Sequence, residues 1–113
     1  MYQQIRQQFA LSDARRDTGV IEPEDVIKYK NIRYASHPVW GLLDVYRPKE
    51  STGICPVILS VHGGGWVYGD KDLYRFYCMS LARQGFAVVN YSYRLAPEYR
   101  FPASLEDTNT VCT

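Results

Sequence analysis

The chain has 113 residues, enough for one small domain, and its 46% hydrophobic and 22% charged residues are ordinary for a globular protein. The net charge of +1 gives no sign of a nucleic-acid surface or of a polyanionic partner. No basic-then-apolar leader opens the chain, and no apolar run approaches the ~20 residues of a membrane span. The three cysteines, Cys55, Cys78 and Cys112, lack CxxC spacing, so we expect reduced thiols and a cytoplasmic protein.

The first 25 residues are interpreted as an N-terminal arm that precedes the domain. Residues 1–19 are polar, with Ile5 and Phe9 near helical spacing and Gly19 in place to end a helix. A short amphipathic helix and a frayed arm explain this pattern equally well. The sequence predicts that the globular domain occupies residues 26–113.

Four segments of the domain have the character of strands. Residues 26–34 alternate and are rich in β-branched and aromatic side chains, and residues 42–46 follow after a break at 36–38. These two segments are close enough to pair as an antiparallel hairpin. Residues 56–61 and 86–91 are nearly continuous apolar runs, which is typical of strands covered on both faces.

A helix is predicted between the two apolar strands, and another at the end of the chain. Residues 70–84 place apolar side chains on one face, with Asp70 or Asp72 as the cap and Gly85 as the stop. The apolar side chains of that face are Leu73, Phe76, Tyr77, Leu81 and Ala82. A second helix begins at Ala103. The sequence therefore predicts an α/β fold, in which an antiparallel hairpin leads into a parallel βαβ unit.

A glycine-rich loop, SVHGGGWVYGD at residues 60–70, joins the third strand to the helix. A dinucleotide-binding loop would need a third glycine where this chain has Tyr68. A phosphate-binding Walker loop would need a lysine where it has Asp70. His62 has only distant carboxylates to complete a metal site, so we expect neither a metal nor a cofactor.

The remaining use of such a loop is an oxyanion hole. The carbonyl oxygen of an attacked ester gains negative charge, which donors fixed in place beforehand can stabilise. Backbone N–H groups serve well when no side chain blocks the carbonyl, and glycine leaves that space. An HGGG loop between the third strand and the first helix is the arrangement found in lipases and esterases.

The chain resembles the hormone-sensitive-lipase-like branch of the α/β-hydrolases. The resemblance covers mainly residues 40–107 and rests on HGGGW at 62–66, Gly69-Asp70, YRLAPE at 93–98 and FPA at 101–103. It implies an α/β-hydrolase fold and the hydrolysis of a small-molecule carboxylic ester without a cofactor. In position only, the arm at residues 1–25 resembles the segment that caps the site in this family.

The resemblance also implies roles for individual residues. Gly64 and Gly65 would donate their backbone N–H groups to the oxyanion, and His62 would hold the shape of the loop instead of acting as the catalytic base. Trp66 would line the acyl or alcohol pocket, with plain core packing as the alternative. Three further residues would form a structural ion-pair and turn network beneath the site, namely Arg94, Glu98 and Asp107.

The chain lacks the nucleophile that this family requires. No GxSxG pentapeptide occurs in it, and both histidines, His37 and His62, precede any position for such an elbow. We therefore expect the 113 residues to be the N-terminal portion of a longer enzyme, inactive alone, with a hydrophobic sheet edge left uncovered. The oligomeric state is left open.

Two other functions are compatible with the same residues. Arylformamidases and related amide hydrolases carry similar HGG-W loops. Plant gibberellin receptors resemble this family and bind a small molecule where the substrate would lie, since a fold does not determine a function. A GxSxG elbow with a later aspartate and histidine would indicate a hydrolase, whereas loss of the histidine would favour the receptor.

Overall fold

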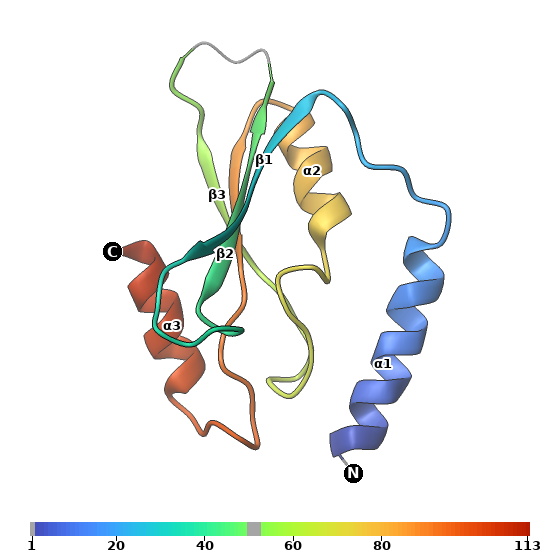
Figure 1. Cartoon of the computed structure of the whole chain (residues 1–113), viewed down its shortest axis with the longest axis vertical. Helices are drawn as coiled ribbons and strands as arrows, with labels where there is room; N and C mark the ends of the chain where they lie inside the picture. Colours follow the sequence, from blue (N-terminus) through green and yellow to red (C-terminus); the bar gives the residue numbers. More distant parts are fainter. Residues whose placement is uncertain (1, 50–52) are drawn as a thin grey trace.

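The computed structural model describes residues 2–49 and 53–113. Within them the chain forms one four-stranded sheet and three helices (Figure 1). In chain order the elements are α1 (Tyr2–Asp17), β1 (Val26–Arg33), β2 (Leu42–Pro48), β3 (Val57–Val61), α2 (Arg75–Arg83), β4 (Ala87–Tyr91) and α3 (Ala103–Cys112). None of these helices is both long enough and apolar enough to cross a bilayer.

The strands lie in the order β1-β2-β4-β3. β1 and β2 pair as an antiparallel hairpin, and β3 and β4 pair in parallel on either side of the α2 crossover. Both predicted pairings are therefore confirmed. The two units are joined by an antiparallel β2–β4 pairing, in which Asp44 lies opposite Asn90.

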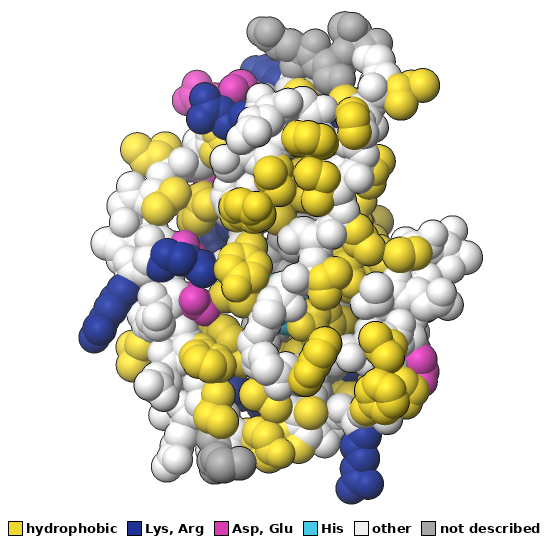
Figure 2. Space-filling model, turned by 180° about the vertical axis from the view of Figure 1, so that it is seen from behind, with side chains coloured by type: hydrophobic (Ala, Val, Ile, Leu, Met, Phe, Trp, Pro, Cys, Tyr) yellow, Lys and Arg dark blue, Asp and Glu magenta, His cyan; other side chains and the backbone are white. Residues whose placement is uncertain are grey.

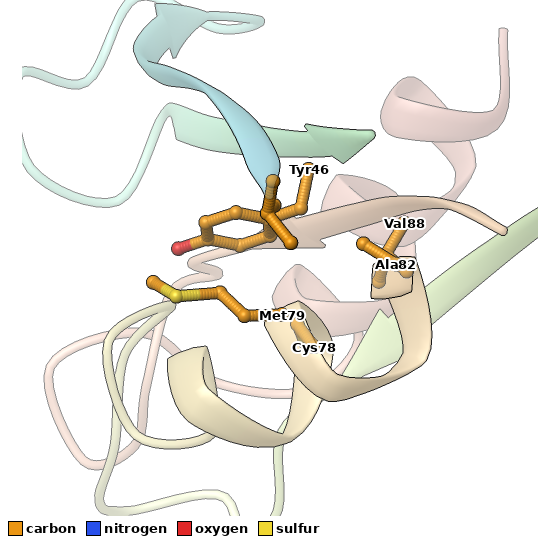
Figure 3. Close-up of a cluster of buried hydrophobic side chains, with 6 residues drawn as sticks. Tyr46, Cys78, Met79, Ala82 and Val88 are labelled. Atoms are coloured by element: carbon orange, nitrogen blue, oxygen red, sulfur yellow. The ribbon is translucent and has the colours of Figure 1, made fainter. Parts of the chain in front are cut away.

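One face of the sheet packs against α2. Tyr46, Val88, Cys78, Met79 and Ala82 point toward one another between the strands and the helix (Figure 3). All five side chains are fully buried. Their apolar area, removed from water at about 25 cal/mol per Å², is the main source of stability on this face.

The other face of the sheet packs against α3, which lies across the sheet from α2 (Figure 1). Tyr91, Tyr93 and Leu95 form the buried centre there, and Val111 of α3 packs against them. The Tyr91 hydroxyl also lies 2.8 Å from Thr108 Oγ1. The helix predicted to begin at Ala103 is present over Ala103–Cys112 and packs on this face through Val111.

The start of α2 and its buried face differ from the sequence prediction. The helix begins at Arg75 instead of residue 70, and Tyr77, expected in the core, is 63% exposed. The Lys71 carbonyl, which a helix starting at residue 70 would pair with the Arg75 N–H, instead accepts from the Asn90 side chain, and the Arg75 N–H donates to the Asp72 carbonyl. With the later start, the buried face carries Cys78, Met79 and Ala82. Gly85 ends the helix as predicted, with φ +107°.

β3 is not covered on both faces as its apolar sequence predicts. Val57 and Val61, which lie on the same face of the strand, are 67% and 51% exposed, and among the described residues no strand pairs with the edge of β3 opposite β4. Hydrophobic side chains also gather down the middle of the face turned away in Figure 1 (Figure 2). The uncovered hydrophobic sheet edge expected from the sequence is therefore present among the described residues.

The N-terminal arm forms a helix, α1, but not one with a buried apolar face. None of its described residues is buried, and Phe9 and Leu11 are 40% and 63% exposed. The helix lies beside the glycine loop at the lower end of the sheet in Figure 1. Its contacts with the rest of the chain are mainly polar.

Candidate functional site

The glycine loop leaves β3 at the carboxyl end of the parallel β3–β4 pair. Gly64 and Gly65 have φ angles of +130° and +62°, in the region that glycine adopts without steric cost. A Cβ on Gly64 would lie 2.0 Å from the Tyr68 carbonyl oxygen, whereas a Cβ on Gly65 would meet nothing within 4 Å. The loop therefore needs glycine at 64 to close on itself, and Gly65 borders open space.

His62, at the start of the loop, is buried inside the fold. Its ring stacks on Tyr93 with centroids 4.2 Å apart and planes 9° apart, and the Tyr93 hydroxyl donates to the His62 carbonyl at 2.6 Å. His62 Nδ1 lies 2.7 Å from the Gly63 carbonyl oxygen, which assigns the proton to Nδ1. Burial lowers the pKa of His62, against the raising effects of that hydrogen bond and of Asp70. The ring is therefore neutral at physiological pH.

Gly69 leaves room for this histidine ring. Its φ is +108°, and a Cβ at this position would lie 2.6 Å from His62 Nδ1. The first and last parts of the loop thus meet at the ring. This close approach explains why the Gly69-Asp70 pair has glycine at its first position.

Trp66 is not a core residue. Its side chain is 61% exposed, and its backbone is held by the Ala96 N–H, which donates to the Trp66 carbonyl at 2.8 Å. Of the two roles left open by the sequence, plain core packing is therefore wrong. The indole lies on the surface of the loop.

α1 binds the glycine loop through contacts that sequence reasoning did not predict. Arg6 Nε donates to the Val67 carbonyl at 2.7 Å and Nη2 to the Ala96 carbonyl at 3.1 Å. Asp13 accepts a 2.7 Å hydrogen bond from the Tyr68 hydroxyl. A cavity of about 760 Å³ lies between α1 and residues 68–75. A polar helix without an apolar stripe carries no sequence signal for such contacts.

Only part of the predicted ion-pair network forms as expected. Arg94 and Asp107 are joined by a 2.9 Å ion pair, and Asp107 also accepts from the Arg94 N–H at 2.8 Å. Glu98 instead pairs with Arg6 of α1 at 2.8 Å. Glu98 is exposed, and the Arg6 guanidinium lowers its pKa to about 2.

The sequence contains no GxSxG elbow. Ser60 lies within β3, and Ser92 is buried with its hydroxyl accepting from the Lys71 N–H. His37 Nδ1 accepts from the N–H groups of Val39 and Trp40 in another loop. In the part of the chain that the structure describes, no group of three or more metal-ligating side chains comes together.

The strand order β1-β2-β4-β3 with a glycine loop after β3 defines the α/β-hydrolase fold, and comparison with solved structures confirms it. Esterase B from Lactobacillus rhamnosis, solved with a tributyrin phosphonate inhibitor, superposes with a TM-score of 0.90 at 34% identity, over 98% of this chain and 37% of the esterase. An esterase from the bacterial hormone-sensitive lipase family gives 0.74 at 25% identity, over 99% and 35%. The chain belongs to the BD-FAE family, whose sequence profile matches residues 43–113.

Curated relatives are similar over much of this chain and over a small part of their own length. Probable carboxylesterase 11 of Arabidopsis thaliana is 44% identical in an 82-residue alignment that covers 65% of this chain and 18% of that protein. The FAD-linked oxidoreductase pytB of Aspergillus terreus is 34% identical in a 109-residue alignment that covers 91% of this chain and 13% of that protein. The chain therefore spans less than a fifth of either relative and about a third of esterase B.

Proposed function

We propose that this chain supplies the oxyanion-hole loop of a serine carboxylic-ester hydrolase. The observation that carries the proposal is the left-handed backbone of Gly64 and Gly65, at the carboxyl end of β3, with open space beside Gly65. The esterase names of the relatives and the phosphonate bound to esterase B support the substrate class. A small-molecule ester is the partner, and neither metal nor cofactor takes part.

The proposed chemistry is acyl transfer. A serine oxygen from outside these 113 residues attacks the ester carbonyl carbon, and the π electrons of the carbonyl move to its oxygen. The N–H groups of Gly64 and Gly65 donate to that oxygen, where the negative charge develops. The serine proton passes to a general base that also lies outside these residues. When the tetrahedral intermediate collapses and the bond to the alcohol oxygen breaks, that base gives the proton to the leaving alkoxide, and water later releases the acid.

The neighbouring residues act on the loop and on its surroundings. His62, neutral and stacked on Tyr93, maintains the path of the backbone and takes no proton from the nucleophile. Trp66, exposed on the loop, forms part of the wall around the acyl or alcohol group. α1 covers the site from the side of Tyr68, through Arg6 and Asp13.

A chimera tests this function directly. Residues 1–113 replace the stretch of esterase B that they match, and hydrolysis of p-nitrophenyl butyrate is compared with that by the 113-residue chain alone. We expect turnover by the chimera, abolished by a serine-directed phosphonate, and none by the chain alone. A folded chimera without turnover would contradict the proposed role of the loop, and phosphonate-sensitive turnover by the chain alone would contradict the missing nucleophile.

A further inference from the structure

A buried ion pair lies beneath the segment that follows the glycine loop. Asp44 on β2 is fully buried, and Lys71, in the turns before α2, is 7% exposed. Lys71 Nζ lies 3.2 Å from Asp44 Oδ2. Asp44 also accepts from the Asn31 N–H at 2.8 Å and from the Tyr46 hydroxyl at 3.3 Å. A buried carboxylate needs such partners, and here it has three.

The backbone of Lys71 is held as firmly as its side chain. Its N–H donates to Ser92 Oγ at 3.0 Å, and its carbonyl accepts from the Asn90 side-chain amide. Asn90 lies opposite Asp44 in the β2–β4 register, and Ser92 directly follows β4. Lys71 is therefore bound to two central strands at three points.

This anchor lies where the glycine loop ends. Lys71 comes two residues after Gly69, the glycine that leaves room for the His62 ring. The other end of the loop is held at His62, whose carbonyl accepts from the Tyr93 hydroxyl. At Gly69 the chain passes so close to the His62 ring that an added Cβ would lie 2.6 Å from Nδ1, and at Gly64 an added Cβ would lie 2.0 Å from the Tyr68 carbonyl oxygen. Through these two close approaches, a displacement of residues 69–71 would be passed to Gly64 and Gly65.

We infer that Lys71 is a positioning residue for the reaction: its buried pair with Asp44 sets the angles at which Gly64 and Gly65 present their N–H groups. The inference rests on the proposed function of the loop and adds to it the group that holds the far end of the loop. A misplacement of about 1 Å at a catalytic group can cost about 100-fold in rate. Lys71 itself is directed into the fold and touches no substrate.

The test uses two variants and one control. Lys71→Met keeps the length of the side chain and removes the charge. Ser92→Ala removes only the acceptor of the Lys71 N–H, and is the milder variant should Lys71→Met fold poorly. Arg83→Met breaks the exposed 3.1 Å pair between Arg83 of α2 and Asp25, and is the matched control.

Two measurements are made on these variants. In the complete 113-residue chain, chymotrypsin cleavage after Trp66 or Tyr68 is timed by mass spectrometry. In the chimera with esterase B, kcat and KM are measured per folded enzyme, with folded protein counted by phosphonate titration. For Lys71→Met we expect at least tenfold faster cleavage, and kcat 10- to 100-fold lower with KM within about threefold.

The outcomes distinguish a failure of this inference from a failure of the proposed function on which it rests. For Ser92→Ala we expect a change in the same direction of a few-fold, and for Arg83→Met no change in either measurement. Cleavage and kcat within twofold of the unmodified protein in folded Lys71→Met and Ser92→Ala would overturn the inference. If the unmodified chimera has no turnover, the proposed function fails, and the cleavage rates alone still decide whether Lys71 anchors the loop.

Discussion

Replacement of Gly65 by alanine separates the catalytic use of the glycine loop from its folding. Gly65 has a φ of +62°, and a Cβ built on it meets nothing within 4 Å. The cost in folding is therefore that of a left-handed alanine, about 1–2 kcal/mol. A protein with about 5 kcal/mol of stability stays more than ~99% folded after such a loss. Unfolding cannot then account for a large loss of activity.

The expected loss in turnover is much larger than this. On our proposal the open space beside Gly65 is where the substrate carbonyl approaches, so a methyl group there moves the carbonyl away from the N–H donors. Loss of one oxyanion donor costs about 100- to 1000-fold in kcat, or roughly 3–4 kcal/mol. KM should stay within about threefold, because the charge that the hole binds exists only in the transition state.

Steady-state kinetics and a melting curve on the chimera make the measurement, with Gly85→Ala as the matched control. Gly85 ends α2 at φ +107°, and it also has nothing within 4 Å of an added Cβ. An alanine at this position therefore has the backbone strain of a positive φ but lies outside the candidate site. We expect both variants to melt a few degrees lower and only Gly65→Ala to lose kcat. Equal kcat in the two variants would refute the reasoning. Gly64 is less informative, because its Cβ would strike the Tyr68 carbonyl.

The remaining predictions concern stability. Burial holds the pKa of His62 below the ordinary 6.5, so the unfolded chain binds the proton more readily, and the melting temperature should fall as the pH drops from 7.5 to 5.5. The melting temperature of His62→Gln should fall less over the same pH range, and equal falls would contradict this. Deletion of residues 1–18 should change the urea-unfolding free energy by less than about 1 kcal/mol, since no described residue of α1 is buried and surface pairs contribute little. Asp107→Ala should lower the urea-unfolding free energy by about 2–3 kcal/mol, because the Arg94 N–H and guanidinium lose their buried acceptor. Glu106→Ala removes an exposed partner of Arg94 and should cost less than about 1 kcal/mol, and equal costs would contradict the role of the buried Asp107.

The strands and the loop could be predicted from the sequence because their signals are local. Alternation at 26–34 and the apolar runs at 56–61 and 86–91 predict β1, β3 and β4, and the structure places strands there. The hairpin and the parallel βαβ unit follow from the spacing of these segments. The HGGGW motif marked the loop because glycine is required where backbone passes close to backbone.

Where the prediction failed, contacts between distant residues decided the outcome. α2 begins at Arg75 because the Lys71 carbonyl bonds to Asn90 of the sheet, and a partner 19 residues further along the chain leaves no trace in the periodicity of residues 70–84. The sequence of β3 predicts a buried strand, yet among the described residues no strand pairs with its outer edge. An apolar sequence indicates that a strand can be buried, but it does not show which other element of the fold covers that strand.

The sequence by itself determined the four strands, the presence of the two helices within the domain, the parallel unit and the place of the glycine loop, since their signals lie in short stretches of the chain and in the order of those stretches. Only the tertiary structure decided the contacts that hold the loop: Arg6 against Val67, Tyr93 against His62, and Lys71 against Asp44. The physical reason is that a buried charge or a half-buried arginine finds its partner through the folded geometry. Residues 27 and 61 positions apart have no common pattern along the chain until the fold brings them together.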